Sequence, residues 1–171
     1  HHLPGDYLPE AVAVLDPKRK DCSYPFKELS GCGIGFKLIQ AYAQKHQIPF
    51  EKVERYLDLV VISIASDMVP VSGENRILAY QGLKWLNNNP RPGIKALLEL
   101  CSQKDTIDIS EIVFTIGPRI NAAGRMGDAK RAVNLLISSN EGNASSVSEV
   151  VNNTNTERRN HDVRITEEAV K

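Results

Sequence analysis

The chain has 171 residues, of which 42% are hydrophobic and 25% are charged, with 21 basic side chains offset by 21 acidic ones. This length suits one ordinary domain, and the composition argues against disorder and collagen-like repeats. No apolar run reaches the ~18 residues that cross a bilayer, and zero net charge argues against a uniformly basic coat for nucleic acid while it permits a local basic track.

The first half of the chain predicts one strand followed by helices. The apolar run 11–15 is rich in valine and is ended by Pro17, which favours a buried strand of a parallel sheet. A turn of small residues at 31–35 leads into a helix over 36–43. Apolar residues at helical spacing predict a second helix over 51–66.

The second half predicts several further helices and one irregular segment. Asp108 and Glu111 have the spacing of a capping box, and Gly117-Pro118 is expected to close the short helix that follows. The segment 119–127 is expected to be irregular, and a long polar helix is expected from about residue 143. The remaining helices are expected over 74–86, 94–101 and 129–137.

Cysteine usage indicates the redox environment. Cys22, Cys32 and Cys101 form an odd set without a Cys-x-x-Cys spacing, so neither a disulfide framework nor a zinc knuckle is predicted. A reducing cytoplasm fits this pattern best.

Two adjacent histidines open the sequence. Neutral imidazole binds divalent transition metals and a histidine can also contact a phosphate, so His1 and His2 are candidates for such a site. The alternative is the remnant of a purification tag, although the segment 3–6 that follows is not an evident linker.

Asp67 is a second candidate, because it lies where an apolar helical stripe meets the loop Met68-Val69-Pro70. A carboxylate at the edge of buried structure requires a metal, a cation or several hydrogen-bond donors. The alternatives are that Asp67 caps the next turn or pairs with Arg76.

Two arginines lie in the glycine- and alanine-rich segment 117–126, where small side chains would let a phosphate approach the backbone. Arg119 and Arg125 suit bidentate phosphate recognition, but solvated arginines in a connection between helices are the alternative. The glycine-rich turn at 31–35 offers backbone N–H groups at a helix start, although such runs also serve tight helix packing. It is not a dinucleotide fingerprint, because its glycine spacing is wrong.

Together these segments resemble the RecJ-type single-stranded-DNA exonucleases of the DHH phosphoesterase superfamily, along nearly the whole chain. The similar blocks are His1-His2-Leu3-Pro4, Asp16-Pro17-Lys18-Arg19 with Asp21-Cys22, Tyr24-Pro25-Phe26-Lys27-Glu28-Leu29-Ser30-Gly31, Gly35-Phe36-Lys37-Leu38, Ile64-Ala65-Ser66-Asp67-Met68-Val69-Pro70, Gly73-Glu74-Asn75-Arg76, Gly117-Pro118-Arg119-Ile120-Asn121-Ala122-Ala123-Gly124-Arg125 and residues 155–159.

The resemblance implies a phosphodiesterase that uses two Mn²⁺ or Mg²⁺ ions and removes nucleotides from single-stranded DNA in the 5′-to-3′ direction during recombination and repair. It implies that His1 and Asp67 are metal ligands and that His2 is the catalytic residue that contacts the scissile phosphate or the nucleophilic water. Phosphate of the DNA would be bound by Arg125, with Arg119 as second choice, and by the turn residues Ser30, Gly31 and Gly33.

The implied fold is α/β and rich in helix. Residues 1–138 would form the later part of a DHH catalytic domain, a parallel sheet flanked by helices, and residues 139–171 a long connecting helix toward a DHH-associated domain. His1-His2 would end the family's Asp-His-His motif, and the family's earlier carboxylate motifs would precede it. We therefore expect this chain alone to bind metal weakly and to have little or no activity.

The resemblance also implies a cytoplasmic monomer whose partner is single-stranded DNA, with a single-strand-binding protein or a helicase as protein partners and no membrane. One alternative function is hydrolysis of small phosphates such as pyrophosphate, oligoribonucleotides or a cyclic dinucleotide, against which the segment 117–125 weighs. A second is a non-catalytic nucleic-acid-binding relative, against which the retained His1, His2 and Asp67 weigh.

Overall fold

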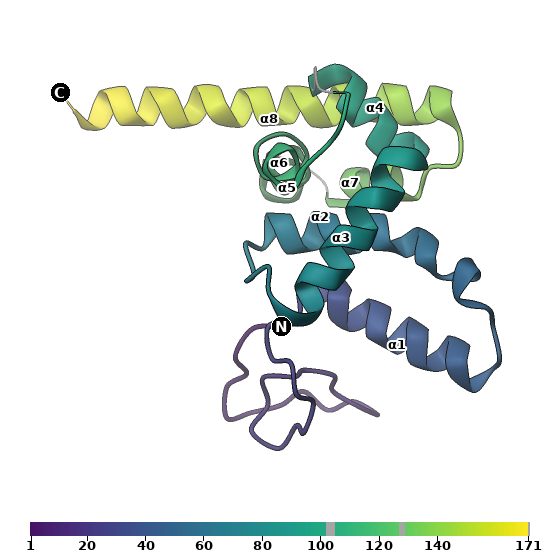
Figure 1. Cartoon of the computed structure of the whole chain (residues 1–171). Helices are drawn as coiled ribbons and strands as arrows, with labels where there is room; N and C mark the ends of the chain where they lie inside the picture. Colours follow the sequence, from purple (N-terminus) through teal and green to yellow (C-terminus); the bar gives the residue numbers. More distant parts are fainter. Residues whose placement is uncertain (102–104, 127–128, 171) are drawn as a thin grey trace. The chain divides into compact units, whose positions relative to one another are not determined.

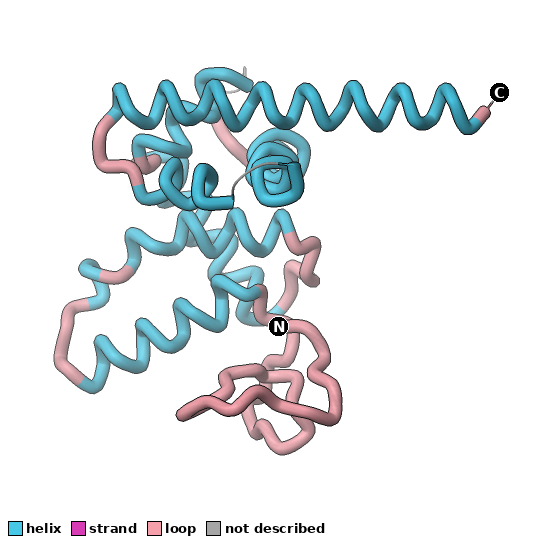
Figure 2. The backbone as a smooth tube through the Cα atoms, turned by 180° about the vertical axis from the view of Figure 1, so that it is seen from behind, coloured by secondary structure: helices cyan, strands magenta, loops and turns pink. Residues whose placement is uncertain are grey.

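The computed structural model describes residues 1–101, 105–126 and 129–170, and its regular structure in these ranges is helical (Figures 1 and 2). The chain divides into two compact units, His1–Asn88 and Asn89–Lys171. The helix-rich character predicted from the sequence is confirmed. None of the described helices is long and apolar enough to span a bilayer.

Residues 1–30 contain neither helix nor strand, and the strand expected over 11–15 is not formed. A strand satisfies its backbone N–H and C=O groups by pairing with a neighbouring strand. No segment in the described ranges pairs with 11–15, so the expected parallel sheet is not observed here. Val12 and Leu15 are consequently exposed instead of being buried.

The first unit contains three α-helices, beginning with α1 (Gly31–Lys45). Ser30 caps α1, because its Oγ accepts a hydrogen bond from the backbone N–H of Gly33 at 3.2 Å. The helix expected over 51–66 is divided into two short 3₁₀ turns, η1 (Phe50–Lys52) and η2 (Glu54–Tyr56), followed by α2 (Leu57–Ser66). In both turns the backbone bonds link residues three apart, from Val53 N to Phe50 O and from Leu57 N to Glu54 O.

Helix α2 forms the core of this unit, between α1 and α3 (Gly73–Asn88). Val61 and Ile64 on α2 are fully buried, as expected for a helix that is apolar nearly all round. Gly82 permits the close approach of α3, because a Cβ there would lie 2.5 Å from the carbonyl oxygen of Leu57. The rigid packing of α2 determines where the chain leaves it, and the next residue is Asp67.

The second unit begins with α4 (Pro92–Cys101) and continues through a run of short helical segments. Asp108 caps α5 (Ile109–Glu111), because its side chain accepts from the backbone N–H of Glu111 at 2.7 Å, which confirms the predicted cap. A π-helical turn, η3 (Ile112–Ile116), follows, then α6 (Gly117–Met126) and α7 (Ala129–Ile137).

The prediction that Gly117-Pro118 ends a helix and that an irregular segment follows is wrong over 117–126, because these residues form α6, and residue 127 lies outside the described residues. Helical backbone continues without a break from η3 into α6, and the N–H of Gly117 donates to Ile112 O, five residues earlier. Pro118, which has no N–H to donate, therefore directly follows a widened π-helical turn. Ala122 and Ala123 are buried, so their small side chains allow α6 to pack closely on its neighbours.

The long polar helix predicted near the end of the chain is α8 (Glu141–Ala169), capped by Asn140, whose side chain accepts from Asn143 N. Its first half packs on α4, α6 and α7, and its buried residues end at Asn155. The rest of α8 is largely exposed and extends beyond the other helices of its unit (Figure 1). The role of 139–171 as a connecting helix stays a prediction.

Candidate functional site

The first unit brings together His1 and Asp67, which are 66 residues apart in its sequence. His1 Nε2 lies 3.6 Å from Asp67 Oδ2, and the His1 side chain is only 23% exposed. The ring of His2 stacks against that of His1, with centroids 4.1 Å apart and planes tilted by 40°, and His2 is exposed. The backbone nitrogen of His1 lies 4.0 Å from Asp16 Oδ1, so a second carboxylate borders the same place.

The N-terminus of α1 lies beside these histidines. A Cβ added at Gly31 would come within 3.4 Å of His1 Nδ1, so the glycine leaves room next to the imidazole. Ser30 is fully buried and Gly33 is buried beneath it, with the serine hydroxyl used as the helix cap. The first N–H groups of a helix attract anions, so this turn is chemically suited to a phosphate next to His1.

Asp67 is placed by the way α2 ends. It is the C-terminal cap of the helix, and its backbone N–H donates to Ser63 O at 2.9 Å. The following residue, Met68, has a φ of 53° and is exposed. A non-glycine residue in this left-handed region costs of order 1 kcal/mol or more, and such residues cluster at functional sites.

The donor set of this pair fits part of a site for Mn²⁺ or Mg²⁺. A distance of 3.6 Å is too long for a hydrogen bond between His1 Nε2 and Asp67 Oδ2. Two ligands bound to one such cation at about 2.1 Å lie roughly 3 to 4 Å apart, which this pair satisfies. Among the described residues no group of three or more His, Cys, Asp or Glu side chains could hold a metal. His1 and Asp67 could therefore supply two ligands of such a site.

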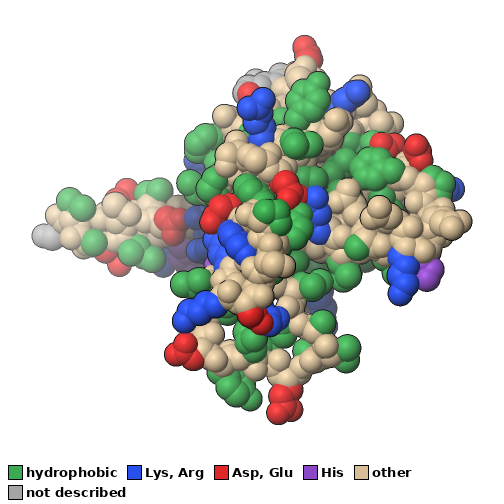
Figure 3. Space-filling view, turned by 60° about the horizontal axis from the view of Figure 1, so that its bottom comes forward, with side chains coloured by type: hydrophobic (Ala, Val, Ile, Leu, Met, Phe, Trp, Pro, Cys, Tyr) green, Lys and Arg blue, Asp and Glu red, His purple; other side chains and the backbone are tan. Residues whose placement is uncertain are grey.

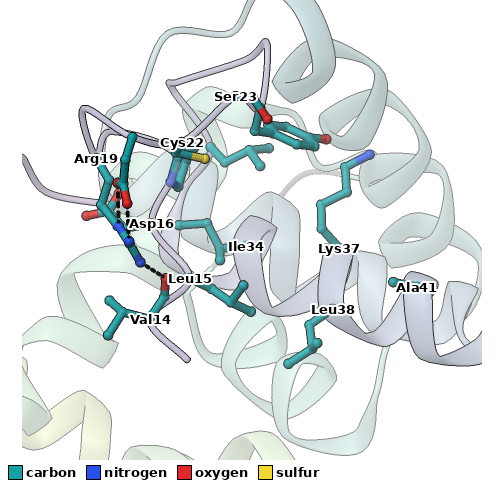
Figure 4. A pocket seen from close by; sticks show the side chains of 14 residues that line it. Val14, Leu15, Asp16, Arg19, Cys22, Ser23, Ile34, Lys37, Leu38 and Ala41 are labelled. Atoms are coloured by element: carbon teal, nitrogen blue, oxygen red, sulfur yellow. Dashed lines mark hydrogen bonds and ion pairs between the residues drawn. The ribbon is translucent and has the colours of Figure 1, made fainter. Parts of the chain in front are cut away.

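A cavity of about 450 Å³ adjoins the site and shares Asp16 with it (Figure 4). One wall comes from the irregular segment 14–24 and the other from α1, including Ile34 and Leu38. Arg19 lies at this cavity, held by both carboxylate oxygens of Asp21 and by Val14 O. The lining is mainly apolar, and Asp16 is the lining residue that also lies near His1.

A partly buried ion pair between α1 and α3 also binds the irregular segment that precedes α1. Lys37 Nζ on α1 lies 2.6 Å from Glu74 Oε2 on α3, and the hydroxyl of Tyr24 donates to the same carboxylate at 2.8 Å. Burial by itself would raise the pKa of Glu74, but the hydrogen bonds from Lys37 and Tyr24 outweigh it and lower this pKa. This cluster holds the segment that precedes Ser30 in place.

The two candidate arginines both lie on α6 in the second unit, and their environments differ. Arg119 donates through Nε to Asn152 Oδ1 on α8 at 2.9 Å and through Nη1 to Thr115 O at 2.8 Å. Arg125 is exposed. Arg125 is therefore the more available cation, and Arg119 joins two helices. Figure 3 shows basic and acidic side chains interspersed on the face it presents, in keeping with the neutral composition.

Sequence reasoning missed three polar side chains that border the site. Asp16 lies near His1, Ser63 donates to Asp67 Oδ2 at 3.2 Å, and Asn75 donates to two backbone carbonyls beside the site. The spacing of Ser63 four residues before Asp67 on one helix was available as a signal. The contact of Asp16 with His1 and that of Asn75 with Glu28 join residues distant in sequence, so no local pattern could reveal them.

Comparisons with known proteins converge on one group. Residues 1–64 match the DHH family, N-terminal domain. The chain is 39% identical over 155 residues to the single-stranded-DNA-specific exonuclease RecJ of Escherichia coli, covering 84% of this chain and 27% of that protein. It is also 39% identical over 172 residues to RecJ of Bacillus subtilis, covering 99% and 21%.

A solved structure shares the fold. The crystal structure of RecJ in complex with Mn²⁺ from Thermus thermophilus superposes with a TM-score of 0.85 at 27% identity, covering 98% of this chain and 25% of that chain. A second crystal structure, of RecJ in complex with Mg²⁺ from the same organism, superposes with a TM-score of 0.77. The chain spans about a quarter of the length of the relatives named here.

Proposed function

This chain is homologous to a segment of the RecJ exonucleases and matches the DHH family, and from that premise we propose that it supplies part of the metal-dependent active site of a nuclease for single-stranded DNA. The observation that carries the proposal is the approach of His1 Nε2 to Asp67 Oδ2 at 3.6 Å, next to His2 and the start of α1. Two candidate metal ligands, a further imidazole and a helix N-terminus are groups that a metal-dependent phosphodiesterase can use to bind a cation and a phosphate.

His1 and Asp67 would hold one of two Mn²⁺ or Mg²⁺ ions. Bound ions of this kind lower the pKa of a coordinated water and neutralise charge that develops on the phosphoryl group. His2 is exposed and stacked on His1, a position from which its imidazole would contact the scissile phosphate or orient the attacking water. Gly31 keeps space open beside His1 for a phosphate.

The remaining candidates would bind phosphates of the DNA. Ser30, Gly31 and Gly33 would border a phosphate at the N-terminus of α1, which attracts anions through its partial positive charge, while the N–H of Gly33 itself donates to Ser30 Oγ. Arg125 is proposed as the main phosphate contact of the second unit because it is exposed. Arg119 becomes the weaker candidate, since its guanidinium already bonds Asn152 and Thr115.

Several wider properties of the full-length protein belong to the same proposal. They comprise the 5′-to-3′ direction, a role in recombination and repair, a cytoplasmic monomer, a single-strand-binding protein or helicase as partner, and low activity of this chain alone. The exposed apolar residues Val12 and Leu15 support a parallel sheet in which 11–15 pairs with a strand from elsewhere in the protein.

The experiment compares two carboxylate neutralisations in the full-length protein that contains this chain. Asp67→Asn keeps the side-chain volume and should reduce Mn²⁺-dependent release of nucleotides from 5′-labelled single-stranded DNA by at least about 100-fold. Asp105→Asn, at an exposed position of the second unit, is the matched control and should keep wild-type activity. Near-normal turnover by Asp67→Asn would refute the assignment, and faster turnover of pyrophosphate than of DNA would reassign the substrate.

A further inference from the structure

The hydroxyl of Ser63 joins Asp67 to the N-terminus of α1. Ser63 Oγ lies 3.2 Å from Asp67 Oδ2 and 3.3 Å from the backbone nitrogen of Cys32. The N–H of Cys32 can only donate, so the serine oxygen is its acceptor, and the hydroxyl proton remains for the carboxylate. Ser63 Oγ therefore accepts from Cys32 and donates to Asp67.

The two hydrogen bonds of Ser63 restrain the side chain of Asp67, which lies at the C-terminal end of α2. Asp67 Oδ2 is the same atom that faces His1 Nε2 at 3.6 Å, so Ser63 bonds the oxygen that would bind a cation with His1. A hydroxyl that donates to a ligating carboxylate limits its rotation and holds its orientation.

A second bridge holds the backbone of the same two segments. Asn75 is fully buried, and its Nδ2 donates to Glu28 O at 2.6 Å and to Pro70 O at 3.0 Å. Glu28 precedes the cap of α1, and Pro70 follows Asp67 by three residues. Asn75 therefore secures the main chain on both sides of the site, while Ser63 is the residue that touches the carboxylate.

From these contacts we propose that Ser63 is a positioning residue that orients the Asp67 carboxylate for cation binding with His1. The inference rests on the proposed function of Asp67 and assigns Ser63 no contact with DNA. Removing the Ser63 hydroxyl leaves the Asp67 carboxylate in place but lets it rotate. The variant should therefore bind the cation more weakly, while its turnover at saturating cation should change less.

The test measures Mn²⁺ dependence in the full-length protein. Ser63→Ala should raise the Mn²⁺ concentration for half-maximal nuclease activity about 10-fold to 100-fold, with kcat at saturating Mn²⁺ changed far less. Mn²⁺ binding without DNA, followed by the loss of the free-ion electron paramagnetic resonance signal, should weaken in parallel. Ser63→Thr keeps the hydroxyl and should restore both values.

Ser66→Ala is the matched control on the same helix. The Ser66 hydroxyl is buried without a hydrogen-bond partner, so its removal should leave Mn²⁺ affinity unchanged. If Ser63→Ala proves unstable in thermal unfolding, Ser63→Cys has a similar volume and a much weaker donor, and the same loss of Mn²⁺ affinity is expected of it.

Wild-type Mn²⁺ affinity in Ser63→Ala or Ser63→Cys, beside an inactive Asp67→Asn, would overturn the role of Ser63 and leave the proposed function standing. Equal weakening by Ser63→Ala and Ser66→Ala would also overturn it, because it would indicate a general disturbance of α2. Wild-type activity in Asp67→Asn would instead refute the proposed function itself.

Discussion

Substitution of Gly82 by alanine tests the packing that places Asp67. The added Cβ would lie 2.5 Å from Leu57 O and 2.8 Å from Val61 Cβ. Ordinary contact begins near 3.4 Å, so α2 and α3 would have to separate by roughly 0.9 Å in a closely packed core. The atom in the way is backbone, which cannot move aside by changing a rotamer.

The expected loss of stability follows from two opposing effects. Overpacking a core costs typically ~1–3 kcal/mol, and the contact with a backbone oxygen places this site at the upper end. Alanine in a helix interior is favoured over glycine by about 1 kcal/mol. Gly82→Ala should therefore lower the free energy of unfolding by about 1–2 kcal/mol.

Gly35→Ala on α1 is the matched control. Gly35 is exposed and a Cβ there would meet nothing within 4 Å, so only the gain in helix propensity applies. This variant should be more stable than wild type by about 0.5–1 kcal/mol. The two glycine-to-alanine changes are thus expected to have opposite signs.

Urea unfolding monitored by tryptophan fluorescence measures both variants. Trp85 is the single tryptophan of the chain and lies on α3, three residues after Gly82, so its emission reports on the unit in question. Gly82→Ala should lower the unfolding midpoint by on the order of 1 M urea at an unchanged slope. Equal midpoints for Gly82→Ala and Gly35→Ala would refute the close approach of α2 and α3.

Two further predictions concern charged side chains. Arg119→Ala should lower the midpoint of thermal unfolding while Arg125→Ala does not, because Arg119 is the arginine that bonds Asn152 and Thr115. Arg125→Ala should instead reduce the slope of log affinity for single-stranded DNA against log salt concentration by about one. An unchanged slope would contradict the role of Arg125. Because the pKa of Glu74 lies below its ordinary 4.5, its contribution to stability is present above that value and is lost as pH falls below it. Glu74→Gln should flatten that loss in urea midpoints measured from about pH 5 to pH 3, and curves parallel to wild type would count against the ion pair with Lys37.

Local pattern was sufficient for most helices and for the cap at Asp108. The capping box at Asp108, the helix over 129–137 and the apolar stripe of α2 depend on interactions between residues three or four apart, which sequence spacing encodes directly. The segment 117–126 was predicted wrongly because glycine and proline usually interrupt helices, whereas here Gly117-Pro118 follows the π-helical turn η3 without a break and two alanines of α6 are buried.

The strand expected over 11–15 shows the opposite case. Its valine-rich run has the composition of a buried strand, yet a strand is completed only by a partner, and the described residues supply none. Propensity therefore described a preference of the segment and not its conformation in this chain.

The sequence by itself determined which side chains could carry chemistry, since the types and order of His1, His2, Asp67 and Arg125 are visible in the printed letters and resemble one family. Only the tertiary structure decided which of them meet. The packing of α2 brings Asp67 within 3.6 Å of His1 across most of a unit's sequence, and it directs the Ser63 hydroxyl to both Asp67 and the start of α1. Contacts between distant segments depend on how apolar faces bury against one another, and no local spacing encodes that.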